Sequence, residues 1–141
     1  MARILSIDYG RKRTGLAVTD PLQIIAGGLV TVSTSALFDW LVDYTAKEQV
    51  ERIVIGEPHQ TNGRPSENWE RVMQFVSRWR RAMPQIPIET YDERFTSVLA
   101  HKAMLDGGLR KKARQDKAMV DEISATILLQ DYMRSRELKH R

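Results

Sequence analysis

The sequence predicts an α/β fold built on a mixed β-sheet, and two observations support this prediction. Three short segments of strand character open the chain. Segments of helical period then alternate with short β-branched segments. Because consecutive β-α-β units form parallel strand pairs covered by helices, the order βββαβαβα indicates a partly parallel sheet headed by an antiparallel meander. Since 141 residues suit one ordinary domain, we assign residues 1–141 to a single domain.

The three opening strands differ in their hydrophobic pattern. Residues 2–8 carry apolar side chains on both faces, which is typical of a central strand. After a turn, residues 15–19 predict a second strand, which ends at Asp20-Pro21. Residues 29–32 predict a third strand, so these segments form the expected meander.

The later elements follow from changes in hydrophobic period. Apolar residues at helical spacing predict helices, and short apolar runs beside turn residues predict buried strands. Trp40, Trp69 and Trp79 fall on helical stripes, so we interpret them as core residues rather than as platforms for stacked bases. The expected elements are a helix from residue 35, a strand at 52–56, a helix around 69–79, a strand at 86–91, a helix from 96 to 106 and a last helix over about 116–138.

The composition excludes several classes of protein. Cysteine is absent, which excludes a thiol nucleophile, a disulfide framework and a Cys-ligated metal. No apolar segment approaches the ~18 residues of a membrane span, and the apolar start of the chain is too short for a signal peptide. We therefore expect a cytoplasmic protein with no membrane partner.

Positive charge is concentrated in one segment. The net charge is +4, and residues 110–117 carry five cations and one acid. Such a concentration suits a polyanionic partner such as nucleic acid, through phosphate neutralisation, whereas a solvated surface is the alternative. The five cations are Arg110, Lys111, Lys112, Arg114 and Lys117.

Acidic residues on three separate elements are the candidates for chemistry. Asp8 ends the first strand, at the carboxyl edge where open α/β sheets bind ligands, although aspartates also cap turns. Asp92 and Glu93 follow the fifth predicted strand, and alternation points them to opposite faces, so only one faces the pocket of Asp8. The pattern does not choose between these two.

Asp121 is the third candidate, because it lies on an otherwise apolar and small-residue face of the last helix with Ser124 and Ala125. A carboxylate on that face is costly unless a cation meets it, and the alternative is an exposed acid in the first helical turn. The small residues would let the helix lie close to the sheet.

The predicted ligand set favours a hard cation. Carboxylate oxygens, without cysteine and without histidines at ligand spacing, suit Mg²⁺ or Mn²⁺. Two such ions roughly 3.5 to 4 Å apart can activate a water and stabilise the leaving oxygen of a phosphodiester. The acids therefore point to a phosphodiester hydrolase that needs no nucleophilic side chain.

Four motifs occur in order along the whole chain, and together they resemble the YqgF family of the ribonuclease H-like superfamily, whose members are described as Holliday junction resolvases and as pre-16S rRNA nucleases. The motifs are DYGRKRTGLAV from Asp8, VIGEP from Val54, DERFTS from Asp92 and KAMVDEISA from Lys117. The resemblance implies a five-stranded mixed sheet in the order βββαβαβα. Glu57 departs from the pattern, because the family has an apolar residue there, and it adds a fourth acid near the pocket.

The resemblance also implies roles for individual residues. Asp8, Glu93 and Asp121 would be the catalytic acids and the metal ligands, which selects Glu93 over Asp92. Arg94 and Lys117 would lie near the acids or the scissile phosphate.

The resemblance implies a metal-dependent endonuclease on structured nucleic acid, with maturation of the 5′ end of pre-16S rRNA and ribosomal precursor particles as its setting. We expect Arg94 and the cations of the basic segment to contact phosphates. One alternative is a Holliday junction resolvase acting on DNA, which would favour a homodimer over a monomer because two symmetric cuts need two sites. Another is a non-catalytic nucleic-acid-binding module, and a sugar-kinase-like ATPase is disfavoured because it needs two related domains.

Overall fold

The computed structural model describes residues 2–58, 67–93 and 117–139. The predicted order of strands and helices is confirmed over these ranges, and the helix expected from 96 to 106 lies outside them. The elements are β1 (Arg3–Asp8), β2 (Arg13–Thr19), β3 (Ala26–Ser33), the 3-10 turn η1 (Thr34–Ala36), α1 (Leu37–Lys47), β4 (Val50–Glu57), α2 (Trp69–Ala82), β5 (Ile88–Asp92) and α5 (Lys117–Lys139).

The five strands form one mixed sheet in the order β3-β2-β1-β4-β5. β1, β2 and β3 pair antiparallel, which confirms the predicted meander. β4 pairs parallel to β1, and β5 pairs parallel to β4, as expected for strands joined by covering helices. β1 lies at the centre of the sheet, with its carboxyl end beside the carboxyl ends of β4 and β5.

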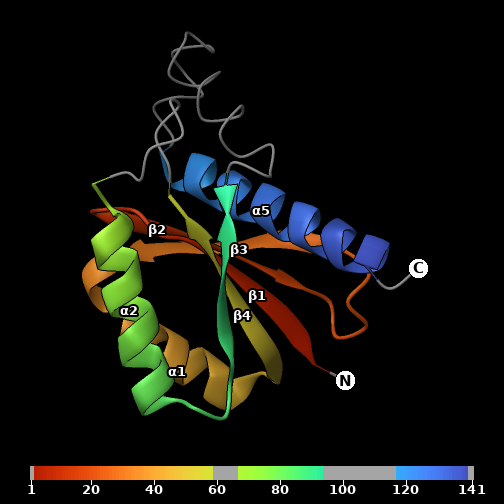
Figure 1. Cartoon of the computed structure of the whole chain (residues 1–141), viewed down its shortest axis with the longest axis horizontal. Coiled ribbons are helices and arrows are strands. Elements are labelled where there is room, and N and C mark those ends of the chain that lie inside the picture. Colours follow the sequence, from red (N-terminus) through yellow and green to blue (C-terminus); the bar gives the residue numbers. More distant parts are fainter. Residues whose placement is uncertain (1, 59–66, 94–116, 140–141) are drawn as a thin grey trace, which may run out of the picture.

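Helices cover both faces of the sheet (Figure 1). Leu5 and Ile7 of β1 pack into a core shared with α1 and α2, and Ile4 packs into a second core shared with α5. Successive strand residues point to opposite faces, so Ser6 and Asp8 point to the α5 face with Ile4. Because helices cover both faces of β1, apolar residues occur at both its odd-numbered and its even-numbered positions. In the described part of the chain, no helix is both long and apolar enough to cross a membrane.

β3 is longer than the hydrophobic pattern predicts, since it begins at Ala26 rather than at residue 29. Glycines at its start resemble a loop in sequence, but their main chain pairs with β2, Gly27 with Val18 and Gly28 with Ala17. A Cβ on Gly28 would lie 3.4 Å from Cβ of Glu122, which is an ordinary van der Waals contact with α5. Backbone pairing with β2 therefore overrides the low strand propensity of glycine.

The tryptophans differ in how deeply they are buried. Trp79 is fully buried, and its Nε1 donates a hydrogen bond of 3.0 Å to the carbonyl of Ile86. Trp40 packs at the edge of the same core and stacks on Tyr44, with ring centroids 5.0 Å apart. The core interpretation is confirmed for these two residues, whereas Trp69 is half-buried at the start of α2.

Candidate active site

Asp8 lies at the carboxyl end of the central strand, where the acid is 7% exposed. It is opposite Gly15 of β2 in the sheet register. The pairing of Ile7 with Ile55 places Gly56 of β4 next to Asp8 on the other side. Because neighbouring residues across a sheet share a face, Asp8 lies between two glycines on the face covered by α5.

The two glycines make room for the other two acids. A Cβ on Gly56 would lie 3.0 Å from Oε1 of Glu93. A Cβ on Gly15 would lie 2.9 Å from Cβ of Asp121, and closer still to the Asp121 backbone carbonyl. Glu93 and Asp121 therefore approach the sheet on either side of Asp8, so three elements distant in sequence bring the predicted acids together.

Gly10 and Gly15 are needed for different structural reasons. Gly15 admits the backbone of α5, a role that the sequence did not reveal. Gly10 permits a tight turn, because a Cβ there would overlap the backbone carbonyl of Arg13.

Asp92 and Glu93 lie on opposite faces of the sheet, as alternation predicts. Glu93 is 3% exposed and lies against Gly56, on the α5 face. Asp92 is paired in register with Glu57. Alternation along β4 puts Glu57 on the opposite face, because Ile55 packs into the core shared with α1 and α2. The fourth acid noted in the sequence is thus near the same end of the sheet but on its other side.

Asp121 has a cation as a partner. Nε of Arg13 donates to Oδ2 of Asp121 at 3.3 Å. The side chains are 43% and 24% exposed respectively, so this ion pair faces solvent. Arg13 begins β2 and lies beyond the pair formed by Asp8 and Gly15, at the outer edge of the site. Arg13 is not among the residues predicted from the sequence, although its alternation with Gly15 places both on one face.

The turn between β1 and β2 is held in place by two other elements. Thr34 donates from its hydroxyl to the carbonyl of Gly10 at 2.7 Å, and from its backbone N–H to the carbonyl of Lys12 at 2.9 Å. Asn68, just before α2, donates from Nδ2 to the carbonyl of Tyr9 at 2.9 Å. These bonds fix the backbone that follows Asp8.

The side chain of Tyr9 is held between the turn and α2. Its ring packs against Phe75 with centroids 5.8 Å apart. Burial raises the pKa of Tyr9, and the charge of Arg71 offsets part of this rise. The phenol therefore stays neutral at physiological pH and adds no negative charge beside the acids.

The last helix is held close to the sheet by small residues. Ser124 and Ala125 are buried, as their size predicts, and the hydroxyl of Ser6 donates to the carbonyl of Ala125 at 2.7 Å. Ser6 is two residues before Asp8 on β1, and Ala125 is one helical turn after Asp121 on α5. It therefore fixes the distance between the two elements that carry these acids.

The acids converge without forming a finished ligand set. Across residues 2–58, 67–93 and 117–139, no three His, Asp or Glu side chains are arranged to hold a metal ion. The oxygen donors of the three acids are the type that a hard cation such as Mg²⁺ prefers. The residues present therefore fit such a cation by their chemistry.

Most of the basic residues predicted to contact nucleic acid lie outside the described residues. Lys117 is the first residue of α5, but its side chain is not described. The structure adds Arg11, Lys12 and Arg13, three exposed cations in succession beside Asp8. The remaining predicted residues, Arg94, Arg110, Lys111, Lys112 and Arg114, lie outside the described residues.

Comparison with known proteins agrees with this architecture. The family model RuvX, described as "Holliday junction resolvase", matches residues 2–135. A protein of Phocaeicola vulgatus named "Putative pre-16S rRNA nuclease" is 61% identical over 137 residues, which cover 97% of this chain and 99% of that protein. A protein of the same name from Flavobacterium johnsoniae is 57% identical over 136 residues, covering 96% and 99%.

A solved structure supports the fold. The RuvC of T. thermophilus, in complex with a Holliday junction substrate, aligns with a TM-score of 0.57 and 15% identity over 96% of each chain. RuvC has the ribonuclease H-like fold that the sequence motifs implied. The resemblance to the YqgF family is confirmed as well: the chain belongs to the RuvX family and has its ribonuclease H-like fold.

Proposed function

We propose that this chain is a metal-dependent endonuclease that hydrolyses phosphodiester bonds in structured nucleic acid and matures the 5′ end of pre-16S rRNA in the cytoplasm. Residues 1–141 would act as one ribonuclease H-like nuclease domain. The observation that carries the proposal is the convergence of Asp8, Glu93 and Asp121 on one face at the carboxyl end of β1. The names of the relatives support pre-16S rRNA as the substrate.

The three acids would hold the metal. Their oxygens are the ligands that Mg²⁺ and Mn²⁺ prefer, and burial of Asp8 and Glu93 gives them a dry setting in which a cation is held strongly. A divalent cation in such a site lowers the pKa of water and stabilises the charge that develops on phosphodiester oxygens.

The chain's own residues set the geometry of this site. Asp8 is on a central strand and Asp121 is on a helix pressed against Gly15, so both backbones are rigid. Glu93 lies against Gly56 and is shielded from solvent. Acids on rigid elements need little reorganisation when substrate binds, which favours catalysis.

Binding of the substrate would depend on cations around the acids. We assign phosphate contacts to Arg94, Arg110, Lys111, Lys112, Arg114 and Lys117. The exposed turn from Arg11 to Arg13 supports this assignment, because it places further positive charge at the same end of the sheet. The partners would be pre-rRNA and ribosomal precursor particles.

A DNA junction is the second candidate substrate. The description of the RuvX family as Holliday junction resolvases favours it. This activity would call for a homodimer, whereas cleavage of a single rRNA strand is compatible with a monomer. Cleavage assays on both nucleic acids separate the two candidates.

The test is cleavage of a pre-16S rRNA fragment and of a four-way DNA junction with Mn²⁺, Mg²⁺ or EDTA. We expect metal-dependent cutting of the RNA that falls to background in Asp8→Asn, Glu93→Gln and Asp121→Asn, while folding and RNA binding persist. Asp92→Asn is the matched control, because Asp92 is adjacent to Glu93 but faces the other side of the sheet.

Each other outcome changes the proposal in a defined way. Cutting of the junction alone would replace rRNA with DNA as the substrate. Wild-type cutting by Asp8→Asn or Asp121→Asn would show that the three acids are not the catalytic site. Binding of RNA without any cutting would favour the non-catalytic module.

A further inference from the structure

The ion pair between Arg13 and Asp121 places a cation on one of the three acids. The contact joins Nε of Arg13 to Oδ2 of Asp121 at 3.3 Å. A guanidinium has five N–H donors, and this contact engages one of them. Asp121 therefore has a charge partner before any metal binds.

A divalent cation and Arg13 would compete for the same carboxylate. The proposed metal ligands include Asp121, and a dication on this carboxylate would repel the guanidinium. The ion pair faces solvent, with Arg13 43% exposed, so breaking it is easy and leaves no buried charge. Arg13 is therefore able to leave Asp121 without disturbing the fold.

The position of Arg13 determines where it would go. It begins β2 two residues before Gly15, about 7 Å beyond the level of Asp8 on the same face. This is the outer side of the acid site, where a bound nucleic acid would carry its phosphates. Arginine suits such a contact, because its planar donors match phosphate oxygens in a bidentate manner.

We propose that Arg13 is an exchangeable cation: it pairs with Asp121 in the metal-free protein, and it turns outward to contact a substrate phosphate when a divalent cation binds the acids. Metal binding and phosphate recognition are then coupled through one side chain. This inference rests on the proposed function, since it takes Asp121 as a metal ligand.

The first measurement is a calorimetric titration with Mn²⁺ alone of wild type, Arg13→Gln and Arg11→Gln. Removing the competing cation is expected to tighten Mn²⁺ binding about two- to fivefold in Arg13→Gln, the range expected for an exposed ion pair. Arg11→Gln is the matched control. It removes the same charge from the same turn, and within the described residues the structure gives Arg11 no contact with Asp121.

The second measurement is fluorescence anisotropy of a labelled pre-16S rRNA stem, with Ca²⁺ or with EDTA. In Ca²⁺, Arg13→Gln is expected to bind the stem about tenfold more weakly, with a smaller salt dependence. In EDTA the loss should be less than about twofold, because Arg13 of the wild type is then held by Asp121. If Arg13 had a purely structural role, Arg13→Gln would weaken the binding of both Mn²⁺ and RNA. The proposal instead expects Mn²⁺ to bind more tightly.

The outcomes separate this inference from the proposed function. If wild type binds no Mn²⁺, both are wrong. If wild type binds Mn²⁺ and Arg13→Gln binds it equally or more weakly, the exchange is overturned while the metal site stands. An equal loss of RNA affinity in Ca²⁺ and in EDTA would also overturn the exchange, because Arg13 would then contact phosphate whether or not metal is bound.

Discussion

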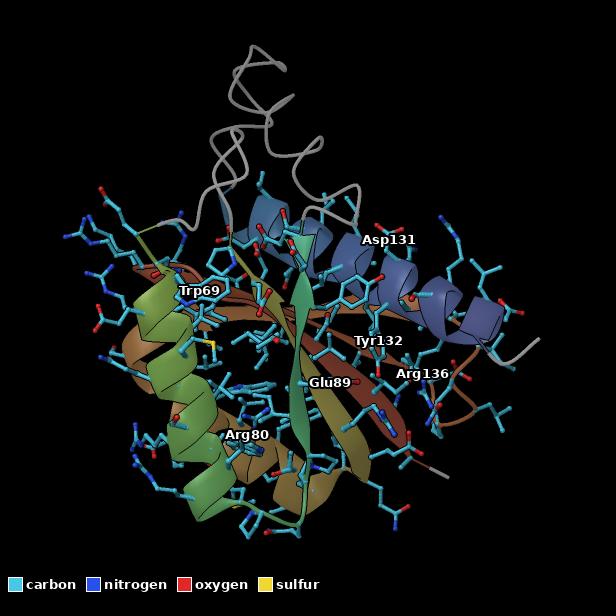
Figure 2. All side chains as sticks on the ribbon, in the orientation of Figure 1. Trp69, Arg80, Glu89, Asp131, Tyr132 and Arg136 are labelled. Carbon is cyan, nitrogen blue, oxygen red and sulfur yellow. The ribbon has the colours of Figure 1, made fainter. Side chains whose placement is uncertain are left out.

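The two ends of α5 are held to the sheet in different ways. At the acid end, the helix backbone lies against Gly15, and an exposed ion pair joins Asp121 to Arg13. About 16 Å further along the helix, Tyr132 is buried and donates a hydrogen bond to Oε1 of Glu89. Figure 2 shows Glu89 on β5 and Tyr132 on α5 pointing toward one another.

Arg52 of β4 completes this second contact, and we call Arg52, Glu89 and Tyr132 the Arg52 cluster. Arg52 Nη1 lies 3.3 Å from Oη of Tyr132 and 3.4 Å from Oε1 of Glu89. Each member thus contacts both others, across three elements. Arg136, on the next turn of α5, lies over the Tyr132 ring at 5.8 Å from its centroid.

The difference between the exposed ion pair and the Arg52 cluster shows how α5 can be held on the sheet while the carboxylate of Asp121 stays exchangeable. A cluster whose members share partners resists the loss of any one contact, whereas an exposed ion pair is worth little. The Arg52 cluster and the close backbone contact at Gly15 hold α5. The carboxylate of Asp121 can then change partners without movement of the helix.

The largest expected effect comes from the backbone contact at the acid end. In Gly15→Ala the new methyl group would overlap the backbone of α5, so the helix start must move. We expect a loss of about 1 to 3 kcal/mol in the free energy of unfolding, and a fall in cleavage of at least about tenfold as Asp121 is displaced. Urea denaturation and cleavage rates measure the two effects.

Gly27→Ala is the control for this prediction, because a Cβ there would meet nothing within 4 Å. It should leave both stability and cleavage close to wild type. If Gly15→Ala were equally harmless, the backbone contact would not be what fixes the acid end of α5.

Removing the centre of the Arg52 cluster should have the next largest effect. Arg52→Met leaves Glu89 and Tyr132 without their shared cation, and we expect the free energy of unfolding to fall by about 1 to 2 kcal/mol. A double-mutant cycle with Glu89→Gln should give a coupling energy above about 0.5 kcal/mol. Additive effects would mean that the cluster does not act as a unit.

The exposed ion pair should contribute less to stability than the cluster. We expect Arg13→Gln to lower the free energy of unfolding by about 0.2 to 1 kcal/mol, and by less in high salt. Chemical denaturation at two salt concentrations tests this. A loss as large as that of Arg52→Met would mean that Arg13 is a structural residue and would weaken the comparison between the two ends.

The smallest effect is a pH dependence confined to alkaline solution. Burial, followed by the hydrogen bond with Glu89, raises the pKa of Tyr132 above its ordinary value of 10.0. Because the folded pKa is the higher one, this stabilisation is fully present below pH 10 and is lost as the pH rises through the folded pKa. The stability difference between wild type and Tyr132→Phe should therefore be flat up to about pH 10 and fall above it. A flat difference up to pH 11 would contradict the raised pKa.

Local patterns in the sequence predicted the strands and helices, and they predicted the surroundings of two of the three acids, Asp8 and Asp121. Hydrophobic period located the strands and helices, and the missed start of β3 shows where glycine conceals a paired backbone. Asp8 at a strand end and Asp121 on an apolar helix face were both visible as acids that need compensation. Arg13, the partner of Asp121, could not be predicted from a local pattern, since the contact spans 108 positions of the chain.

The sequence by itself determined the α/β class, the order of the elements, the absence of thiol chemistry and the RuvX family motifs, because each depends on residue type and short-range spacing. Only the tertiary structure decided which face each acid occupies, as with Glu93 rather than Asp92 beside Gly56. It also decided that Gly15 serves the approach of α5 and that Asp121 pairs with Arg13. These outcomes depend on strand register and on a helix distant in sequence, and neither is encoded within any single local segment.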